Sequence, residues 1–135
     1  MEPTKIGIVG CGNISGIYCK AGKTFENLEI AACADLVPER AQACAEKSGI
    51  PKACSVDELL ADPEISIVVN LTIPLAHADV AMRAVEAGKS VYNEKPLTVT
   101  REEGKALLTA AEAKGVRVGG APDTFLGAGL HTVRK

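Results

Sequence analysis

Residues 5–16 read Lys-Ile-Gly-Ile-Val-Gly-Cys-Gly-Asn-Ile-Ser-Gly, and this stretch decides the fold of the chain. Its first half is apolar and β-branched, which predicts a short strand over 5–9. The glycines predict a tight turn, and the residues after them a helix over 14–24. Such a turn leaves backbone N–H groups bare at a helix N-terminus, where the partial positive charge of the helix favours a diphosphate.

Each glycine of the turn is expected to have a distinct structural role. Gly10 permits the sharp bend, and Gly12 lacks the Cβ that would hold a pyrophosphate away from the backbone. We expect the amides along the bend, up to those of Asn13 and Ile14, to bind two linked phosphate groups. A third glycine, usual in this motif, is replaced by Ser15, which concerns helix packing more than phosphate contact.

The composition indicates one domain with an aliphatic core. The chain has 135 residues, of which 47% are hydrophobic but only 3% aromatic, with no Trp. Such a core of Val, Ile, Leu and Ala is typical of a parallel sheet covered by helices. The net charge of −2 and the few aromatic side chains argue against a nucleic-acid partner.

Five cysteines fall in the first 54 residues, an odd number without any C-x-x-C pair. A redox or metal site usually needs paired spacings, so we expect small buried residues in a reducing cytosol and no metal. No apolar run approaches the ~20 residues that span a bilayer. No charged-then-apolar leader precedes the first strand. These features favour a cytoplasmic protein without a membrane partner. The cysteines are Cys11, Cys19, Cys33, Cys44 and Cys54.

Strands and helices are expected to alternate along the whole chain. Further strands are predicted over 28–34, 52–54, 65–71, 90–93 and 117–120. Helices are predicted from 38 to about 48, from a capping box at 55–58 to near 61, from 74 to the glycine at 88, and from a second capping box at 100–103 to 114. A loop leading into another helix is expected over 123–134. This alternation predicts an α/β fold, a doubly wound, six-stranded parallel sheet with helices on both faces.

Ligands of such sheets bind outside the carboxyl ends of the strands, so the residues there are the candidate site. Asp35 ends the second strand and is placed to accept hydrogen bonds from a ribose diol. Its charge would repel a 2′-phosphate, which favours NAD over NADP. Arg40 complicates this preference, although we expect it to be solvated.

Two further strand ends carry polar groups. After the fourth strand come Thr72, Pro74 and His77, which we expect along the nicotinamide side of the cofactor, although a histidine one turn into a helix is often merely half-exposed. After the fifth strand come Glu94 and Lys95. These two form a charged surface corner, or they meet a substrate hydroxyl, with a desolvated lysine accepting its proton.

Three segments give the chain a family resemblance. The turn at 10–14, the stretch 68–77 and above all Ala-Gly-Lys-Ser-Val-Tyr-Asn-Glu-Lys-Pro at 87–96 resemble the glucose–fructose oxidoreductase/inositol dehydrogenase (Gfo/Idh/MocA) family. The resemblance implies an NAD(P)-binding Rossmann domain, with Lys95 in the proton path and Glu94 near the nicotinamide. It also implies hydride transfer to or from sugars, polyols or related carbonyl compounds. Asn93 stands where a small residue or cysteine is commoner, a difference we expect to matter little.

Members of that family carry a second α+β domain that contacts the substrate. We therefore expect residues 1–122 to form the nucleotide-binding domain and 123–135 to begin the connection to that second domain. By the same resemblance the longer protein is a homo-oligomer, and this part alone is inactive because productive geometry needs both domains.

Two other functions remain open from the residues alone. One is a non-catalytic nucleotide-sensing or CoA-binding module, which would not need a lysine directed at a nicotinamide. The other is an interaction domain that self-associates along the exposed edge near the sixth strand.

Overall fold

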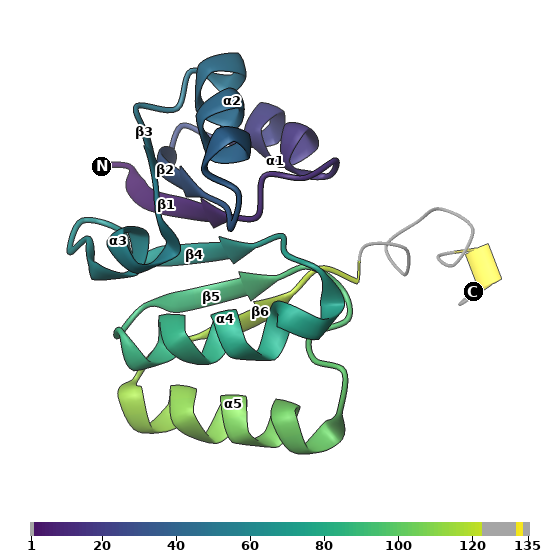
Figure 1. Cartoon of the computed structure of the whole chain (residues 1–135). Coiled ribbons are helices and arrows are strands. Elements are labelled where there is room, and N and C mark those ends of the chain that lie inside the picture. Colours follow the sequence, from purple (N-terminus) through teal and green to yellow (C-terminus); the bar gives the residue numbers. More distant parts are fainter. Residues whose placement is uncertain (1, 123–131, 134–135) are drawn as a thin grey trace.

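A computed structural model describes residues 2–122 and 132–133 and shows a six-stranded, wholly parallel sheet in the order β3-β2-β1-β4-β5-β6 (Figure 1). The chain moves outward from β1 in one direction and then returns to place β4 on its other side. This reversal confirms the doubly wound fold and puts the switch point between β1 and β4. The strands are β1 Thr4–Val9, β2 Leu28–Ala34, β3 Lys52–Cys54, β4 Ile67–Asn70, β5 Ser90–Asn93 and β6 Val118–Gly120.

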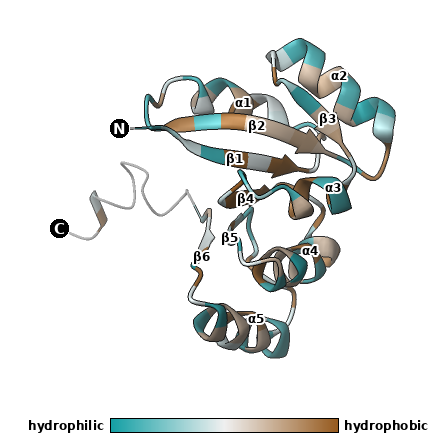
Figure 2. Cartoon of the chain, turned by 90° about the vertical axis from the view of Figure 1, so that its left-hand side faces the viewer, coloured by the Kyte–Doolittle hydropathy of each residue, from teal (hydrophilic) through white to brown (hydrophobic). Residues whose placement is uncertain are grey.

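Helices cover both faces of the sheet, as expected. One buried cluster joins the strands to α1 and α2 and includes Ile8, Cys19 and Cys44. A second cluster joins them to α3, α4 and α5 and includes Leu59 and Leu107. Figure 2 shows apolar colour along β1 and β2 and hydrophilic colour on the outer side of α2. The helices are α1 Ser15–Gly22, α2 Pro38–Ser48, α3 Val56–Ala61, α4 Pro74–Glu86 and α5 Arg101–Lys114.

The predicted helix starts and stops have the expected causes. Ser55 caps α3 and Thr100 caps α5, and in both cases the capping box with the glutamate at the third helical position is complete. Gly49 and Gly115 end α2 and α5 in the left-handed conformation, which a Cβ would disfavour.

Several element boundaries differ from the prediction by one or two residues, and two of these differences have a clear cause. The fourth strand begins at Ile67 rather than at 65, because the carbonyl of Ile65 accepts a hydrogen bond of 2.7 Å from the buried ammonium of Lys89. Helix α1 ends at Gly22 rather than at 24, because the hydroxyl of Thr24 donates to the carbonyl of Ala21 at 2.7 Å and closes the last turn.

The expected loop and helix over 123–134 fall outside the described residues except at 132–133. Across the described ranges, every helix is too short or too polar to traverse a lipid bilayer.

Leu107 should carry much of the packing between α5 and the sheet. Its side chain is 0% exposed, whereas the next residue, Leu108, is 52% exposed. We expect Leu107→Ala to lower the free energy of unfolding by about 2–5 kcal/mol, because it removes buried methyl groups and leaves a cavity. Leu108→Ala is the matched control and should change it by less than about 0.5 kcal/mol. Urea unfolding followed by circular dichroism measures both, and equal losses would contradict this packing.

Candidate functional site

The glycine turn lies at the switch point and touches both halves of the sheet. Gly10 has a φ of +101°, and a Cβ there would come within 2.7 Å of the carbonyl carbon and oxygen of Leu71. The Gly10 amide donates to the carbonyl of Ala34 at 2.8 Å. The turn therefore packs against the end of β2 on one side and the end of β4 on the other, in a space that admits only glycine.

Beyond Gly10 the turn leaves donors free. A Cβ on Gly12 would meet no atom within 4 Å. Among the described residues, the backbone N–H groups of Gly12, Asn13 and Ile14 have no hydrogen-bond acceptor. Ser15 turns inward and donates from its hydroxyl to the carbonyl of Gly12 at 2.7 Å, so it does not cap these amides.

The start of α1 also lacks negative charge. Ile14 provides no side-chain cap, and the first turn of α1 contains no acidic residue. By contrast, α3 and α5 each begin with a capping box and two acidic residues. The N-terminus of α1 thus keeps three free amides and an uncompensated dipole beside open space, which suits a phosphate group. The donors present therefore fit the diphosphate of a dinucleotide.

Asp35 faces this bend. Its Oδ2 accepts a hydrogen bond of 2.8 Å from the amide of Cys11, and its Oδ1 accepts one of 2.9 Å from the amide of Val37. The residue is half-buried, so the carboxylate keeps part of its surface and further lone pairs for a ligand. Both bonds fix its orientation at the carboxyl end of β2.

His77 lies below the loops rather than on their surface. Its ring is 1% exposed. Nε2 lies 3.0 Å from the carbonyl oxygen of Thr72, and Nδ1 lies 2.6 Å from that of Pro96. The histidine therefore joins the loop after β4 to the loop after β5, whereas Pro74, at the first position of α4, is exposed.

A buried asparagine supports the first of these loops. Asn70, at the end of β4, is fully buried, and its Oδ1 accepts a 2.7 Å bond from the hydroxyl of Thr72. Its amide donates to the carbonyl of His77 at 3.1 Å. The sequence reasoning did not single out Asn70; a polar residue ending an otherwise apolar strand was the available signal.

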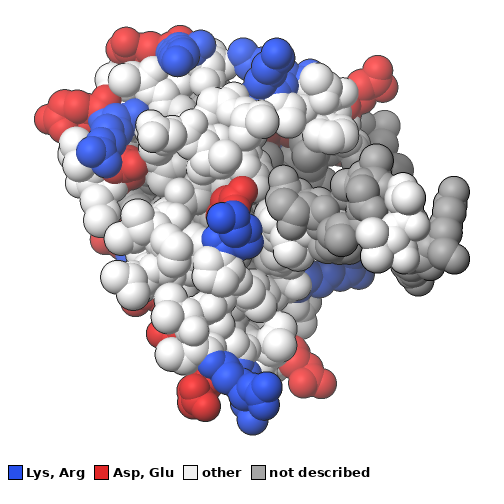
Figure 3. Space-filling model, turned by 90° about the vertical axis from the view of Figure 1, so that its right-hand side faces the viewer, with Lys and Arg blue, Asp and Glu red and all other residues white. Residues whose placement is uncertain are grey.

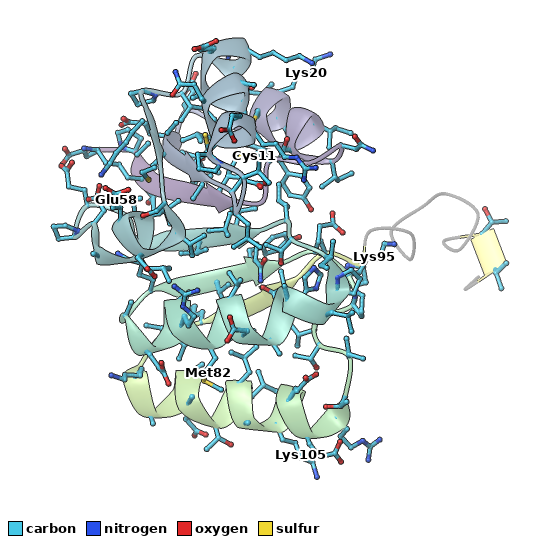
Figure 4. All side chains as sticks on the ribbon, in the orientation of Figure 1. Cys11, Lys20, Glu58, Met82, Lys95 and Lys105 are labelled. Atoms are coloured by element: carbon cyan, nitrogen blue, oxygen red, sulfur yellow. The ribbon has the colours of Figure 1, made fainter. Side chains whose placement is uncertain are left out.

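The segment that carries Lys95 is held from several sides. The carboxylate of Glu94 accepts bonds from the Tyr18 hydroxyl at 2.6 Å and from the Lys95 amide at 3.0 Å. The Glu94 amide donates to the carbonyl of Asn70 at 2.9 Å. The Lys95–Pro96 peptide bond is cis. Glu94 thus links α1 to the end of β5, while the side chain of Lys95 is exposed at the strand-end edge (Figure 4).

Asn93 contributes more to the structure of this segment than the sequence suggested. Its side chain is 0% exposed, and its amide donates to the carbonyl of Leu97 at 2.9 Å, which closes the segment around Lys95. Its Oδ1 is buried without a hydrogen-bond partner in the described part of the chain. The small residue or cysteine that is commoner in the resembling family could not make this bond to Leu97.

The part of the strand-end edge that is visible among the described residues has few charges. Figure 3 looks onto this edge and shows a broad uncharged surface, with one basic and one acidic group together near its middle and other charges toward the rim. A surface of this kind suits the uncharged rings and hydroxyls of a ligand better than an extended anion.

Comparison with known proteins identifies the family. The model of the Gfo/Idh/MocA family, described as an oxidoreductase family with an NAD-binding Rossmann fold, matches residues 4–121. This chain belongs to that family. The resemblance drawn from 87–96 is thereby confirmed.

Individual relatives agree with this assignment. An inositol 2-dehydrogenase of Salmonella typhimurium is 35% identical over 117 residues, covering 84% of this chain and 35% of the relative. The WlbA dehydrogenase of Bordetella pertussis, solved in complex with NADH and UDP-GlcNAcA, matches with a TM-score of 0.91 at 28% identity, over 98% of this chain and 39% of that one. Biliverdin reductase of Synechocystis sp. PCC 6803, in complex with biliverdin and NADP+, matches with a TM-score of 0.90 at 28% identity. The match covers 98% of this chain and 42% of the reductase. The chain spans about a third of the length of the curated relatives it matches.

The two glycines of the turn should respond differently to the same substitution. Gly10→Ala places a methyl group against the backbone at Leu71 and forces an unfavourable positive φ, so we expect a loss of at least about 1–3 kcal/mol in the free energy of unfolding. Gly12→Ala projects into open space and should change stability by less than about 0.5 kcal/mol. Chemical denaturation of both variants tests this, and an equal response would show that the turn does not pack as described.

Proposed function

We propose that this domain holds NAD along the carboxyl ends of its strands. The amides of Gly12, Asn13 and Ile14 would bind the diphosphate, and Asp35 would accept hydrogen bonds from the hydroxyls of the adjacent ribose. The observation that carries this proposal is the set of three unpaired amides at the uncapped start of α1, beside a carboxylate already turned toward them. Gly10 acts by bringing the turn close to the end of β4.

The preference for NAD over NADP rests on Asp35. Its carboxylate is held by two backbone amides and cannot swing away without losing both bonds. A 2′-phosphate on the ribose would meet this negative charge at short range, which is unfavourable. Relatives have been solved with NADH and with NADP+, so the family uses both, and this side chain supplies the discrimination here.

The loops after β4 and β5 would form the nicotinamide side of the site. Thr72 and Pro74 border it, while His77 and Glu94 position its walls through hydrogen bonds to the backbone. We infer that His77 positions the two loops and does not react itself, because its ring is buried and both ring nitrogens face backbone carbonyl oxygens. The bond from Tyr18 to Glu94 ties this side to α1 and hence to the diphosphate side.

In the longer protein, Lys95 would act as the general base or general acid that transfers the proton of the reaction. When bound, NAD or NADH would supply the hydride-transfer chemistry at this site. During oxidation the uncharged amine of Lys95 would take the proton of the reacting hydroxyl, and during reduction its ammonium would give one to the carbonyl oxygen. The substrate class is a sugar, polyol or related carbonyl compound, in keeping with the inositol 2-dehydrogenase relatives.

The isolated chain should turn over slowly or not at all. Its relatives are about three times as long, and hydride transfer requires the substrate to be held in place. Lys95 is exposed here, so the chain by itself does not desolvate the ammonium group. A cytoplasmic location and a homo-oligomeric longer protein complete the proposal.

The test of the cofactor proposal is calorimetry with NAD and NADP on the wild type and on Asp35→Asn. The substitution keeps the shape but removes the charge and one acceptor, so NAD affinity should fall about 10-fold or more. NADP affinity should stay equal or rise, because the repulsion is gone. Asp79→Asn, at an exposed position of α4, is the matched control and should behave as the wild type. A wild type that binds neither dinucleotide would refute the proposal.

The part assigned to Lys95 is tested in a protein that joins this domain to a substrate domain. Lys95→Met should lower kcat by about 10²–10⁴-fold, because the proton acceptor is lost. NAD affinity should change little, since Lys95 is exposed and outside the diphosphate turn. Steady-state kinetics and cofactor titration separate the two effects, and an unchanged kcat would remove Lys95 from the proton path.

A further inference from the structure

Three thiols that lie far apart in the sequence come together beneath the glycine turn. Cys11 belongs to the turn, Cys33 to β2 and Cys44 to α2, and their Sγ atoms all lie within 4.8 Å of one another. Cys33 and Cys44 are buried, and Cys11 is half-buried. The proposed dinucleotide site uses none of these sulfurs. We call this group the thiol triad.

The triad is open to solvent on one side. A hollow of about 620 Å³ between the glycine turn and α2 is lined by Cys11 and Cys44, and also by Gly12 and Asn13, whose amides are proposed to bind the diphosphate. Arg40 and Lys47 of α2 line the same hollow and add positive charge near the sulfurs. Figure 4 places Cys11 beside α1 and α2, on the side of the sheet that these helices cover. A small ion can therefore reach the sulfurs through this hollow.

We propose that Cys11, Cys33 and Cys44 bind one soft, thiophilic metal ion of the class of Zn²⁺, Cd²⁺ and Cu⁺. An ion bound at about 2.3 Å to three sulfurs in a plane keeps them about 4.0 Å apart. The observed separations need only a small contraction to reach that geometry. A donor set of three sulfurs, without oxygen or nitrogen, selects soft ions over Mg²⁺ or Ca²⁺.

Binding of the ion requires the thiols to lose their protons. The neighbouring Cys33 thiol and burial raise the pKa of Cys11, whereas the neighbouring Cys11 thiol lowers the pKa of Cys33. Burial raises the pKa of Cys44. Metal binding would form three metal–sulfur bonds and release the remaining thiol protons to solvent, without any change in oxidation state. The affinity should therefore rise with pH.

Metal binding must also replace existing contacts. The Cys11 thiol lies 3.5 Å from the carbonyl oxygen of Ala34, and the Cys33 thiol lies 3.3 Å from that of Ala41. These are weak thiol hydrogen bonds, and metal–thiolate bonds are far stronger, so their loss does not oppose binding.

The chain provides its own control in Cys54. This thiol is half-buried like Cys11, but it lies outside the triad and directs its sulfur toward the carbonyl of Cys33 at 3.9 Å. Cys54→Ser therefore removes one of the five thiols but none of the three proposed ligand sulfurs, and the serine hydroxyl can still donate to the same carbonyl. If cadmium merely collects on loose thiols, this variant should weaken binding as much as a triad variant does.

The experiment titrates Cd²⁺ into the full 135-residue chain, kept reduced with a phosphine, and follows the thiolate-to-cadmium charge-transfer absorption. We expect one equivalent to bind, with higher affinity at pH 8 than at pH 6. Cys11→Ser, Cys33→Ser and Cys44→Ser should each weaken binding at least about 10-fold, whereas Cys54→Ser should match the wild type. Circular dichroism checks the fold of each variant, and the half-buried Cys11 gives the variant least dependent on core packing.

Three results would overturn the proposal. The first is the absence of a charge-transfer band at one equivalent of Cd²⁺. The second is equal weakening by Cys54→Ser and Cys11→Ser. The third is a cadmium-113 resonance of the bound ion that indicates oxygen or nitrogen ligands instead of three sulfurs, which stays informative even if the Cys33 and Cys44 variants fail to fold.

Discussion

The close approach of Gly10 to the backbone at Leu71 is the constraint on which the rest of the site depends. It brings the end of β1 against the end of β4, where the sheet reverses its order. Because a side chain on Gly10 would separate these strand ends, the turn can direct its free amides outward only while this residue is glycine. The position of Asp35 follows, since its carboxylate is held by the amide of Cys11 in the same turn.

The other side of the site depends on polar groups that are buried and hydrogen-bonded. Asn70, His77 and Asn93 are almost wholly enclosed, and each uses its side chain to hold a loop carbonyl or hydroxyl. Breaking any of these bonds would leave a further buried polar group unpaired, so each bond resists displacement of its loop. The segment with Lys95 is consequently a fixed part of the scaffold, although it lies outside the regular strands.

Much of this could be predicted from the sequence, because local signals and global fold agreed. The glycine turn, the two capping boxes and the alternation of apolar strands with helices predicted a doubly wound parallel sheet and placed Asp35 at the end of its second strand. The enclosure of His77 could not be predicted, since it depends on carbonyls 5 and 19 residues away. The thiol triad could not be predicted from the sequence either. Its members come from a turn, a strand and a helix, and they meet only when α2 packs on the sheet.

The two outer strands of the sheet, β3 and β6, have only three residues each. An outer strand offers its unpaired backbone groups to any other extended chain, and a long one invites stacking into aggregates. Here each border is so short that a foreign strand would gain only a few hydrogen bonds. The brevity of these borders therefore limits edge-to-edge association of the domain.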